Sequence, residues 1–343
     1  MSSTVLILGA KGRFGQACAR AFVQAGWRVL GQIRAGSQAP TEPGVDWLAV
    51  DLSDTALAHA AQGAAVVVHA LSPAYTVAAW RRSALPMLDA AIALAGPLSA
   101  TLMLPGNVYN FGAHMPALLR EDTPQAPTTP MGQIRVAMEE RLAASGVRSV
   151  VIRAGNFFGA ERGTWFDSVM VKDLRKGRVT YAGPAEVTLA WAYLPDLART
   201  FVEVAAQRNE CQPAEVLHFR GHELNPDDWR AVLTPLAIQQ GWLEQDAVLK
   251  QATLPWPAIR IGALLIPTWA ALLKMRYLWN VNHALVNDKL VTLIGAEPHT
   301  PLRSATLAAL AALVDLGFCG HEAQHAPDVA ALTRFTSCEE TSS

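Results

Sequence analysis

The sequence predicts an α/β protein in which a doubly wound parallel sheet is followed by a smaller, mainly helical C-terminal lobe. A strand-like apolar run at residues 5–8 leads straight into a glycine-rich turn and then into a helical pattern at 16–25. Short β-branched runs then alternate with alanine-rich helical stretches as far as about residue 155. Such alternation is typical of a parallel sheet with helices on both faces. It stops after Phe157, where the second lobe is expected to begin.

The individual elements follow from hydrophobic periodicity and from the placement of β-branched residues. These features predict further strands at residues 29–33, 47–50, 65–69, 101–104 and 149–152, and helices at 55–61, 78–95 and 132–145. Ligands of doubly wound sheets bind outside the carboxyl ends of the strands. We therefore expect one crevice to be lined by residues 9–15, Arg34, Asp51, 69–73 and 105–112.

The glycine-rich turn predicts a dinucleotide site of the Rossmann type. Glycines permit a tight bend and a close approach of backbone N–H groups, and the N-terminus of the next helix adds partial positive charge for a pyrophosphate. A strand before the turn and a helix after it are the context that this motif requires. The residues expected to bind the nucleotide here are Gly9, Lys11, Gly12, Arg13, Phe14 and Gly15.

The end of the second strand predicts the choice of cofactor. An acidic residue there accepts hydrogen bonds from the adenosine ribose, whereas an arginine accommodates a 2′-phosphate. The strand ends in Arg34 and contains no acid, so NADP is favoured over NAD, with Lys11 and Arg13 as helpers. The alternative is that Arg34 is a solvated loop charge. Asp51 and Leu52 are expected beside the adenine. The alternative is that Asp51 caps the following helix, because the sequence would be the same in either case.

Length, charge and cysteine content narrow the class of protein. A chain of 343 residues can bury a large core, and a net charge of −1 without a basic stripe excludes nucleic acid as the main partner. The four cysteines lack the paired spacing of a metal site, so no metal is expected. The N-terminus lacks the pattern of a signal peptide, and we expect a cytoplasmic protein that acts on a small molecule.

The change in composition along the chain predicts its division into lobes. We expect residues 1–157, with 188–222 returning to them, to form the NAD(P)-binding lobe. Residues 158–187 and 223–318 are then expected to form the substrate-side lobe. The polar end of the chain, residues 319–343, is expected to be a flexible tail.

One apolar segment, residues 261–273, lies between Arg260 and Lys274. It is shorter than the roughly 20 residues that a bilayer span needs, and Pro267 interrupts it, so no stable membrane insertion is expected. We interpret the segment as a buried helix or as the lining of an apolar pocket. Peripheral membrane contact is the alternative.

A set of motifs carries a resemblance to a known superfamily. The motifs are residues 9–15, 51–52, 67–70, 107–112, 153–159 and 191–198. In this order they resemble the extended or atypical branch of the short-chain dehydrogenase/reductase superfamily, which contains nucleotide-sugar epimerases and dehydratases. The resemblance implies a nicotinamide above the fourth and fifth strands, near Ala70 and Leu71, and a C-terminal lobe that closes on the substrate. It also implies a possible homodimer.

The resemblance further implies a catalytic Tyr-x-x-x-Lys pair, which this chain does not have. Met131 stands at the tyrosine position, and a thioether cannot transfer a proton. Arg135 stands at the lysine position, where it can still hydrogen-bond ribose hydroxyls. The family's Ser or Thr near the end of the fifth strand is also missing, and Asn107 is the nearest polar substitute.

Other side chains are candidates for the missing roles. Tyr109, just past the fifth strand, is the best proton donor, although the tyrosine of this family motif usually packs structurally. His69 at the fourth strand titrates in a suitable range, or else is a neutral neighbour of the cofactor. Asn156 and Phe157 are expected on the substrate side, unless Asn156 only stabilises a turn. Asp196 is expected to be a helix N-cap.

These observations predict an NADP-dependent oxidoreductase of the atypical short-chain type that acts on a small carbonyl or alcohol with a non-standard proton donor. The scattered Arg and Lys residues of the C-terminal lobe form no recognisable sugar-nucleotide clamp, which favours a weakly charged substrate. Two alternatives remain open. One is a non-catalytic NADP(H)-binding sensor or regulatory protein, and the other is a nucleotide-sugar epimerase or dehydratase.

Overall fold

A seven-stranded sheet forms the centre of the computed structural model, which describes residues 3–159 and 163–315. The strand order is β11-β7-β5-β4-β1-β2-β3, and every pairing is parallel. The strands are β1 (Thr4–Leu8), β2 (Arg28–Ile33), β3 (Val45–Ala49), β4 (Ala64–His69), β5 (Thr101–Asn107), β7 (Ser149–Ala154) and β11 (Ala214–His218). The order reverses between β1 and β4, so the crevice of this sheet opens at their carboxyl ends.

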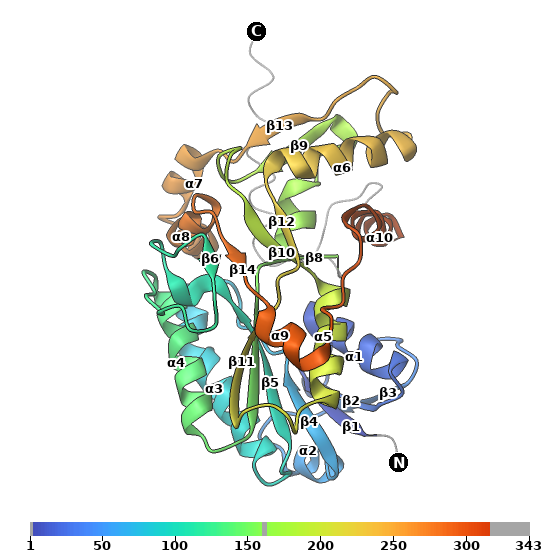
Figure 1. The fold of residues 1–343 in the computed structure, drawn as a ribbon, viewed down its shortest axis with the longest axis vertical. Helices are drawn as coiled ribbons and strands as arrows, with labels where there is room; N and C mark the ends of the chain where they lie inside the picture. The colour runs from blue at the N-terminus through green and yellow to red at the C-terminus, as the bar shows by residue number, and fades with distance from the viewer. Residues whose placement is uncertain (1–2, 160–162, 316–343) are drawn as a thin grey trace.

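Helices cover both faces of the sheet (Figure 1). They are α1 (Arg13–Gln24) and α5 (Leu194–Ala206) on one face, and α2 (Thr55–Ala60), α3 (Val77–Ala95) and α4 (Pro130–Ala144) on the other. Neighbouring strand residues alternate between two apolar cores: Leu6 packs with α3 and α4, whereas Ile7 packs with α1 and α5. This alternation is the period of two of a β-strand that is buried on both faces.

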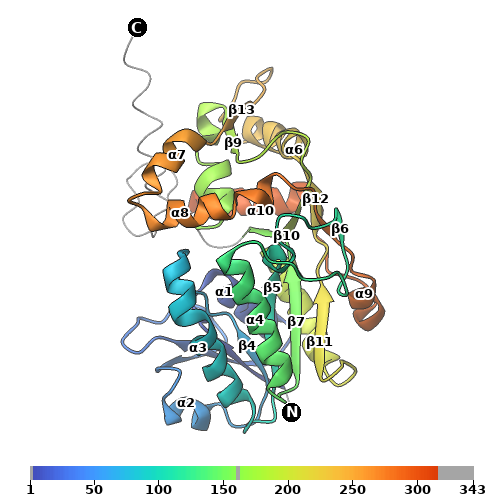
Figure 2. The same cartoon turned by 90° about the vertical axis from the view of Figure 1, so that its left-hand side faces the viewer.

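The C-terminal region lies above the carboxyl ends of the strands (Figures 1 and 2). It contains a sheet of β8 (Asn156–Phe158), β10 (Leu189–Tyr193) and β12 (His222–Leu224), and the pairs β9 (Arg178–Tyr181) with β13 (Lys250–Thr253) and β6 (Leu118–Leu119) with β14 (Ala284–Leu285). Its helices are α6 (Pro226–Gln239), α7 (Trp256–Gly262), α8 (Pro267–Lys274) and α10 (Leu302–Asp315), whereas α9 (Asp288–Ile294) packs beside the large sheet against α5 and β11. The predicted fold class, a doubly wound sheet with a mainly helical C-terminal region, is confirmed.

Strand β5 is longer than the sequence predicts. The expected strand ends at residue 104, but β5 continues through Pro105 to Asn107. Its pairing with β4 stops at Met103, while its pairing with β7 continues to Asn107. Pro105 therefore lies where β5 has a neighbour on one side only, and its missing N–H costs no hydrogen bond to β4.

The apolar segment 261–273 is not a single buried helix. It spans the end of α7, a turn and most of α8. Trp269 and Leu272 are buried, but Ile261, Leu264 and Leu265 are 72%, 84% and 88% exposed. The expectation of a buried helix or pocket lining is therefore wrong for the turn.

Some expectations concern residues outside the described part of the chain, namely the tail at 319–343 and two of the cysteines. The other two cysteines, Cys18 and Cys211, are buried free thiols. Within residues 3–159 and 163–315, no cluster of His, Cys, Asp and Glu could hold a metal ion. Within the same ranges, none of the helices has the length and apolar character needed to cross a bilayer.

Candidate nucleotide site and active site

The glycine turn joins β1 to α1 and faces the end of β4. Gly9 has a φ of +74°, and a Cβ there would lie 2.9 Å from Leu71 Cδ2 and 3.2 Å from the carbonyl oxygen of Ala70. A Cβ at Gly15 would lie 2.5 Å from the carbonyl oxygen of Gly9. Gly12 is the N-cap of α1 and supplies no side-chain cap. The first N–H groups of the helix therefore remain available to an anion.

The side chain of Gln32, on the neighbouring strand β2, hydrogen-bonds the backbone of this turn. Its Oε1 accepts a hydrogen bond of 3.0 Å from the Gly9 N–H, and its Nε2 donates to the carbonyl oxygens of Val50 (2.7 Å) and Ile33 (3.0 Å). The side chain is buried and links the carboxyl ends of β1, β2 and β3. This role was not predicted from the sequence, although Gln32 is a polar residue within a mainly apolar strand.

The basic residues near the turn have different surroundings. Arg34 follows β2 directly and is exposed. Lys11 donates from Nζ to the carbonyl oxygen of Gln38 at 3.3 Å. Arg13 lies against the segment that follows β8, because a Cβ at Gly163 would lie 2.6 Å from its Nη1. Arg34 and Lys11 thus stand beside the loop after β2, while Arg13 faces the C-terminal region.

Asp51 is exposed beyond the end of β3. The N-cap of the following helix α2 is Asp54, whose Oδ1 accepts from the Ala56 N–H at 2.8 Å. The alternative in which Asp51 caps this helix is therefore wrong. Leu52 packs partly buried against the core beneath α3 and α4.

Arg135 lies in the second turn of α4, at the position where the resemblance implies a lysine. Its Nη1 donates to the carbonyl oxygen of Pro105 at 3.2 Å, and its guanidinium lies 5.0 Å from the centre of the Trp80 ring. Among the described residues, its buried Nε has no hydrogen-bond partner. Met131, one helical turn earlier, is 1% exposed and packs in the core.

Three tyrosines gather beside Arg135. The Tyr75 and Tyr109 side chains interact, and the Tyr277 hydroxyl donates to the carbonyl oxygen of Tyr109 at 3.5 Å. Burial raises the pKa of Tyr75 and of Tyr109, and for Tyr109 it outweighs the opposing effects of Tyr75 and of the Arg135 charge. Both phenols are therefore protonated at neutral pH and act as donors rather than bases.

Tyr75 and Tyr277 were missed by the sequence analysis. Tyr75 lies in the loop after β4, and its position two residues beyond the expected crevice residues 69–73 was the available signal. Tyr277 follows α8, far along the chain, and only the tertiary structure brings it to the site.

His69 and Asn107 flank these tyrosines at the ends of β4 and β5. His69 is 1% exposed, and burial lowers its pKa to about 4, so the imidazole is neutral at pH 7. Within the described chain neither ring nitrogen has a partner. A cavity of about 10 Å³ beside His69 and Arg135 has room for about one water molecule. Asn107 Oδ1 accepts from the Tyr109 N–H at 3.0 Å and so fixes the backbone of that tyrosine.

A buried ion pair holds α4 against β7. Glu139 Oε2 lies 2.7 Å from Arg153 Nη2, and the two side chains are 7% and 1% exposed. Asn110, in the turn that carries Tyr109, donates from Nδ2 to Glu139 Oε1 at 2.9 Å. The pair therefore sets the position of both Arg135 on α4 and Tyr109 on its turn.

The expected substrate-side residues lie on another part of the structure. Asn156 and Phe157 form β8 and pair with Trp191 and Ala192 of β10. The alternative of a turn-stabilising asparagine is wrong, since Asn156 lies in a strand. Phe157 packs against the core of α1 and α5, whereas the tyrosine cluster packs against the core on the opposite face.

Asp196 is not the N-cap of α5, because Tyr193 occupies that position. Asp196 lies in the first helical turn, where its carboxylate accepts hydrogen bonds of 2.5 Å from Arg199 Nη2 and from the Thr300 N–H. The carboxylate is buried and ties α5 to the segment before α10.

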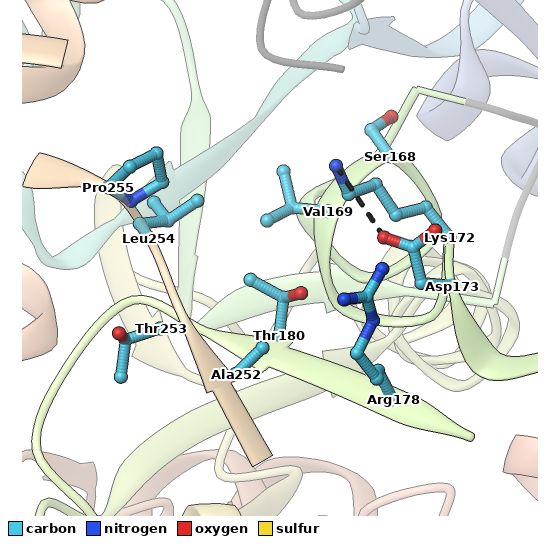
Figure 3. Close-up of a pocket in the computed structure, with 10 residues that line it drawn as sticks. All are labelled: Ser168, Val169, Lys172, Asp173, Arg178, Thr180, Ala252, Thr253, Leu254 and Pro255. Atoms are coloured by element: carbon cyan, nitrogen blue, oxygen red, sulfur yellow. Dashed lines mark ion pairs between the residues drawn. The ribbon is translucent and has the colours of Figure 1, made fainter. Parts of the chain in front are cut away.

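A second pocket, of about 70 Å³, lies in the C-terminal region (Figure 3). Lys172, Asp173 and Arg178 line one side of it, and Leu254 and Pro255 lie across from them. Lys172 Nζ is 3.8 Å from Asp173 Oδ2. Burial lowers the pKa of Lys172, Asp173 opposes this effect, and Arg178 adds to it. This pocket was not predicted from the sequence, although several charged residues lie close together at 172–178.

The sequence profile of the NAD dependent epimerase/dehydratase family matches residues 5–218, from β1 to the end of β11. The chain belongs to this family. The resemblance to the epimerase/dehydratase branch of the short-chain dehydrogenase/reductase superfamily is thereby confirmed. A comparison with curated proteins finds no match.

Solved structures of similar fold include several family enzymes. The Bordetella bronchiseptica enzyme WbmH in complex with NAD+ has 16% identity and a TM-score of 0.70, with 92% of this chain and 100% of that chain covered. MoeE5 in complex with UDP-glucose and NAD has 15% identity and a TM-score of 0.69, with 92% and 99% covered. UDP-glucuronic acid 4-epimerase from Bacillus cereus in complex with NAD has 15% identity and a TM-score of 0.68, with 91% and 99% covered. At these identities the likeness establishes the fold.

Proposed function

We propose that this chain binds NADPH and reduces the carbonyl group of a small organic substrate, with a buried tyrosine hydroxyl as proton donor. The observation that carries the proposal is the cluster of Tyr75, Tyr109 and Tyr277 near Arg135, at the carboxyl ends of β4 and β5. Preference for NADP over NAD and for a small carbonyl over a nucleotide sugar are both part of the proposal.

The residues of the crevice fit a nicotinamide dinucleotide. The turn at Gly9 and Gly15 leaves no space for a side chain, and the first N–H groups of α1 are available to a pyrophosphate. The unpartnered Nε of Arg135 is suited to a ribose hydroxyl. When bound, such a cofactor supplies the hydride, and the protein supplies orientation and the proton.

The protonation of the tyrosines favours the direction of reduction. A buried phenol whose pKa is raised keeps its proton throughout the neutral range, so Tyr109 can donate to a developing alkoxide. Tyr75 lies beside Tyr109, and Asn107 fixes the Tyr109 backbone. His69, neutral at pH 7, is a polar neighbour of the cofactor rather than a charged acid.

Substitution of the tyrosines tests this role. Tyr109→Phe should lower the rate of NADPH oxidation by about 10²-fold to 10⁴-fold, the usual contribution of a general acid. Tyr75→Phe should lower it less, because Tyr75 acts through Tyr109. Tyr181→Phe is the control, since Tyr181 is a buried tyrosine that lies in the aromatic core of the C-terminal region. The measurement is turnover of a carbonyl panel with each purified variant.

Each outcome of this experiment is informative. An unchanged rate for Tyr109→Phe would remove that residue as the proton donor. Tight binding of NADPH without turnover of any carbonyl would instead favour a non-catalytic NADP(H)-binding sensor.

The second pocket favours one other function, that of a nucleotide-sugar epimerase or dehydratase. Lys172 and Arg178 contribute the positive charge that a diphosphate requires, and Asp173 in the same lining offsets part of it. MoeE5, of similar fold, is described in complex with UDP-glucose. For this function UDP-glucose should raise the melting temperature of the wild type and not of Lys172→Ala. No shift with UDP-glucose would leave the reductase as the better proposal.

A further inference from the structure

The turn between α7 and α8 is the most exposed apolar feature of the described chain. Leu265, Leu264 and Ile261 are 88%, 84% and 72% exposed, more than any other large apolar side chain described. The helices on either side of the turn are packed together. Trp269 of α8 is buried and lies against Gly262 of α7, and a Cβ at Gly262 would lie only 2.2 Å from the Trp269 ring. The aliphatic side chains therefore project from a fixed support.

Basic residues flank this turn in the sequence. No Asp or Glu occurs in the sequence between Asp246 and Asp288, whereas Arg260 and Lys274 flank the turn directly. Both are exposed, and neither forms an ion pair with any residue in the described ranges. The turn therefore combines an apolar apex with cationic sides.

The small area and high exposure of these side chains favour a lipid surface over a protein as the binding partner. Aromatic side chains bury about 150–250 Å² each, so three smaller aliphatic side chains fall short of the roughly 800 Å² per partner of a stable protein interface. Leu264 and Leu265, which are more than four-fifths exposed, are instead suited to enter the boundary between lipid headgroups and acyl chains, with Ile261 beside them. Flanking Arg and Lys then lie at the level of anionic headgroups.

We propose that the α7–α8 turn docks the protein on the surface of an anionic lipid bilayer. Ile261, Leu264 and Leu265 enter the headgroup–acyl boundary, and Arg260 and Lys274 pair with lipid anions. The contact is peripheral, which agrees with the lack of a membrane-crossing helix in the described chain. Because α8 leads from this turn to Tyr277, docking holds the tyrosine cluster near the bilayer surface. The inference is independent of the proposed reductase activity.

Vesicle flotation of the full chain tests the proposal. We expect binding to vesicles of phosphatidylcholine with phosphatidylglycerol, and weaker binding to phosphatidylcholine alone or at high salt. The double substitution Leu264→Ser with Leu265→Ser should weaken binding at least about tenfold. Arg260→Gln and Lys274→Gln should each weaken it by roughly fivefold, the usual effect of one basic residue at an anionic surface. Val248→Ser is the control, because Val248 is 66% exposed but lies outside the turn.

Circular dichroism of each variant confirms that the fold is retained. Failure of the full chain to bind either kind of vesicle would overturn the proposal, as would undiminished binding by the double-serine variant. Two other occupants of the turn would also overturn it. If the wild type is a dimer that binds no vesicles, and the double-serine variant is a monomer, the turn is a subunit interface. Vesicle binding only by a chain that ends at Asp315 would show that residues 316–343 cover the turn.

Discussion

Two arginines stand at opposite ends of the proposed cofactor site. Arg34 is exposed beyond β2, beside the glycine turn, and Arg135 is buried against Pro105 and Trp80. Both could be identified from the sequence, because their positions follow from local features: the end of a strand and the spacing along a helix. Tyr277 could not be identified, since its contact with Tyr109 joins segments 168 residues apart.

Arg34 carries the predicted preference for NADP. Arg34→Glu should weaken NADPH binding by at least about tenfold, the loss expected for one hydrogen bond to a charged group, and should change NADH binding little. Arg28→Glu, at the amino end of the same strand, is the control. Dissociation constants for both cofactors can be measured by the fluorescence of the reduced nicotinamide. Equal weakening of both cofactors by Arg34→Glu would refute a role in 2′-phosphate recognition.

At the scale of elements, the predicted strands and helices of the first 155 residues are all present, within a few residues at their ends. Regular periodicity and local caps make such elements visible in a sequence. The role of Asp196 was not visible, because its partner Thr300 is distant in the chain. The ion pair that positions α4 also joins distant segments, and the sequence analysis assigned it no role.

Loss of that ion pair should destabilise the fold. Glu139→Gln leaves the charge of Arg153 buried without a counter-charge, so the free energy of unfolding should fall by about 3–5 kcal/mol. The control is Asp89→Asn, which breaks the pair of Asp89 with Arg141, whose side chains are about half exposed. Its effect should stay below about 1 kcal/mol. Urea unfolding of both variants measures these changes. Equal free energies of unfolding for the two variants would contradict the conclusion that the ion pair anchors α4 against β7.

At the scale of the whole molecule, two cores flank the sheet and a third, rich in aromatic residues, fills the C-terminal region. The division at residues 157 and 158, the homodimer and the cytoplasmic location stay predictions. The C-terminal region was the least visible in the sequence, because tryptophan and leucine at helical spacing do not distinguish the buried Trp269 from the exposed Leu264. Four buried histidines are a further property of the whole fold: His69, His218, His222 and His283.

These histidines predict a loss of stability in mild acid. Burial lowers the pKa of His69 and His283 to about 4 and that of His218 to about 3, below the unfolded value near 6.5. The unfolded chain therefore binds more protons below pH 6.5, and stability falls as the pH drops from there towards 4. Each such histidine should lower the free energy of unfolding by about 2 kcal/mol at pH 5 relative to pH 7.

Urea unfolding at the two pH values measures this loss. The variant His283→Gln should show a smaller loss than the wild type, since one titrating group is removed. Identical stability at pH 7 and pH 5 would contradict the buried, neutral state of these side chains.

Direct titration with NADPH tests the nucleotide site on which the proposed function depends. Wild-type protein should bind NADPH saturably and more tightly than NADH. Gly15→Ala should abolish binding while retaining the fold, because its Cβ would lie 2.5 Å from the carbonyl oxygen of Gly9 and displace the turn. A wild type that binds neither nucleotide, or a Gly15→Ala variant that binds as well as the wild type, would contradict a dinucleotide in this crevice.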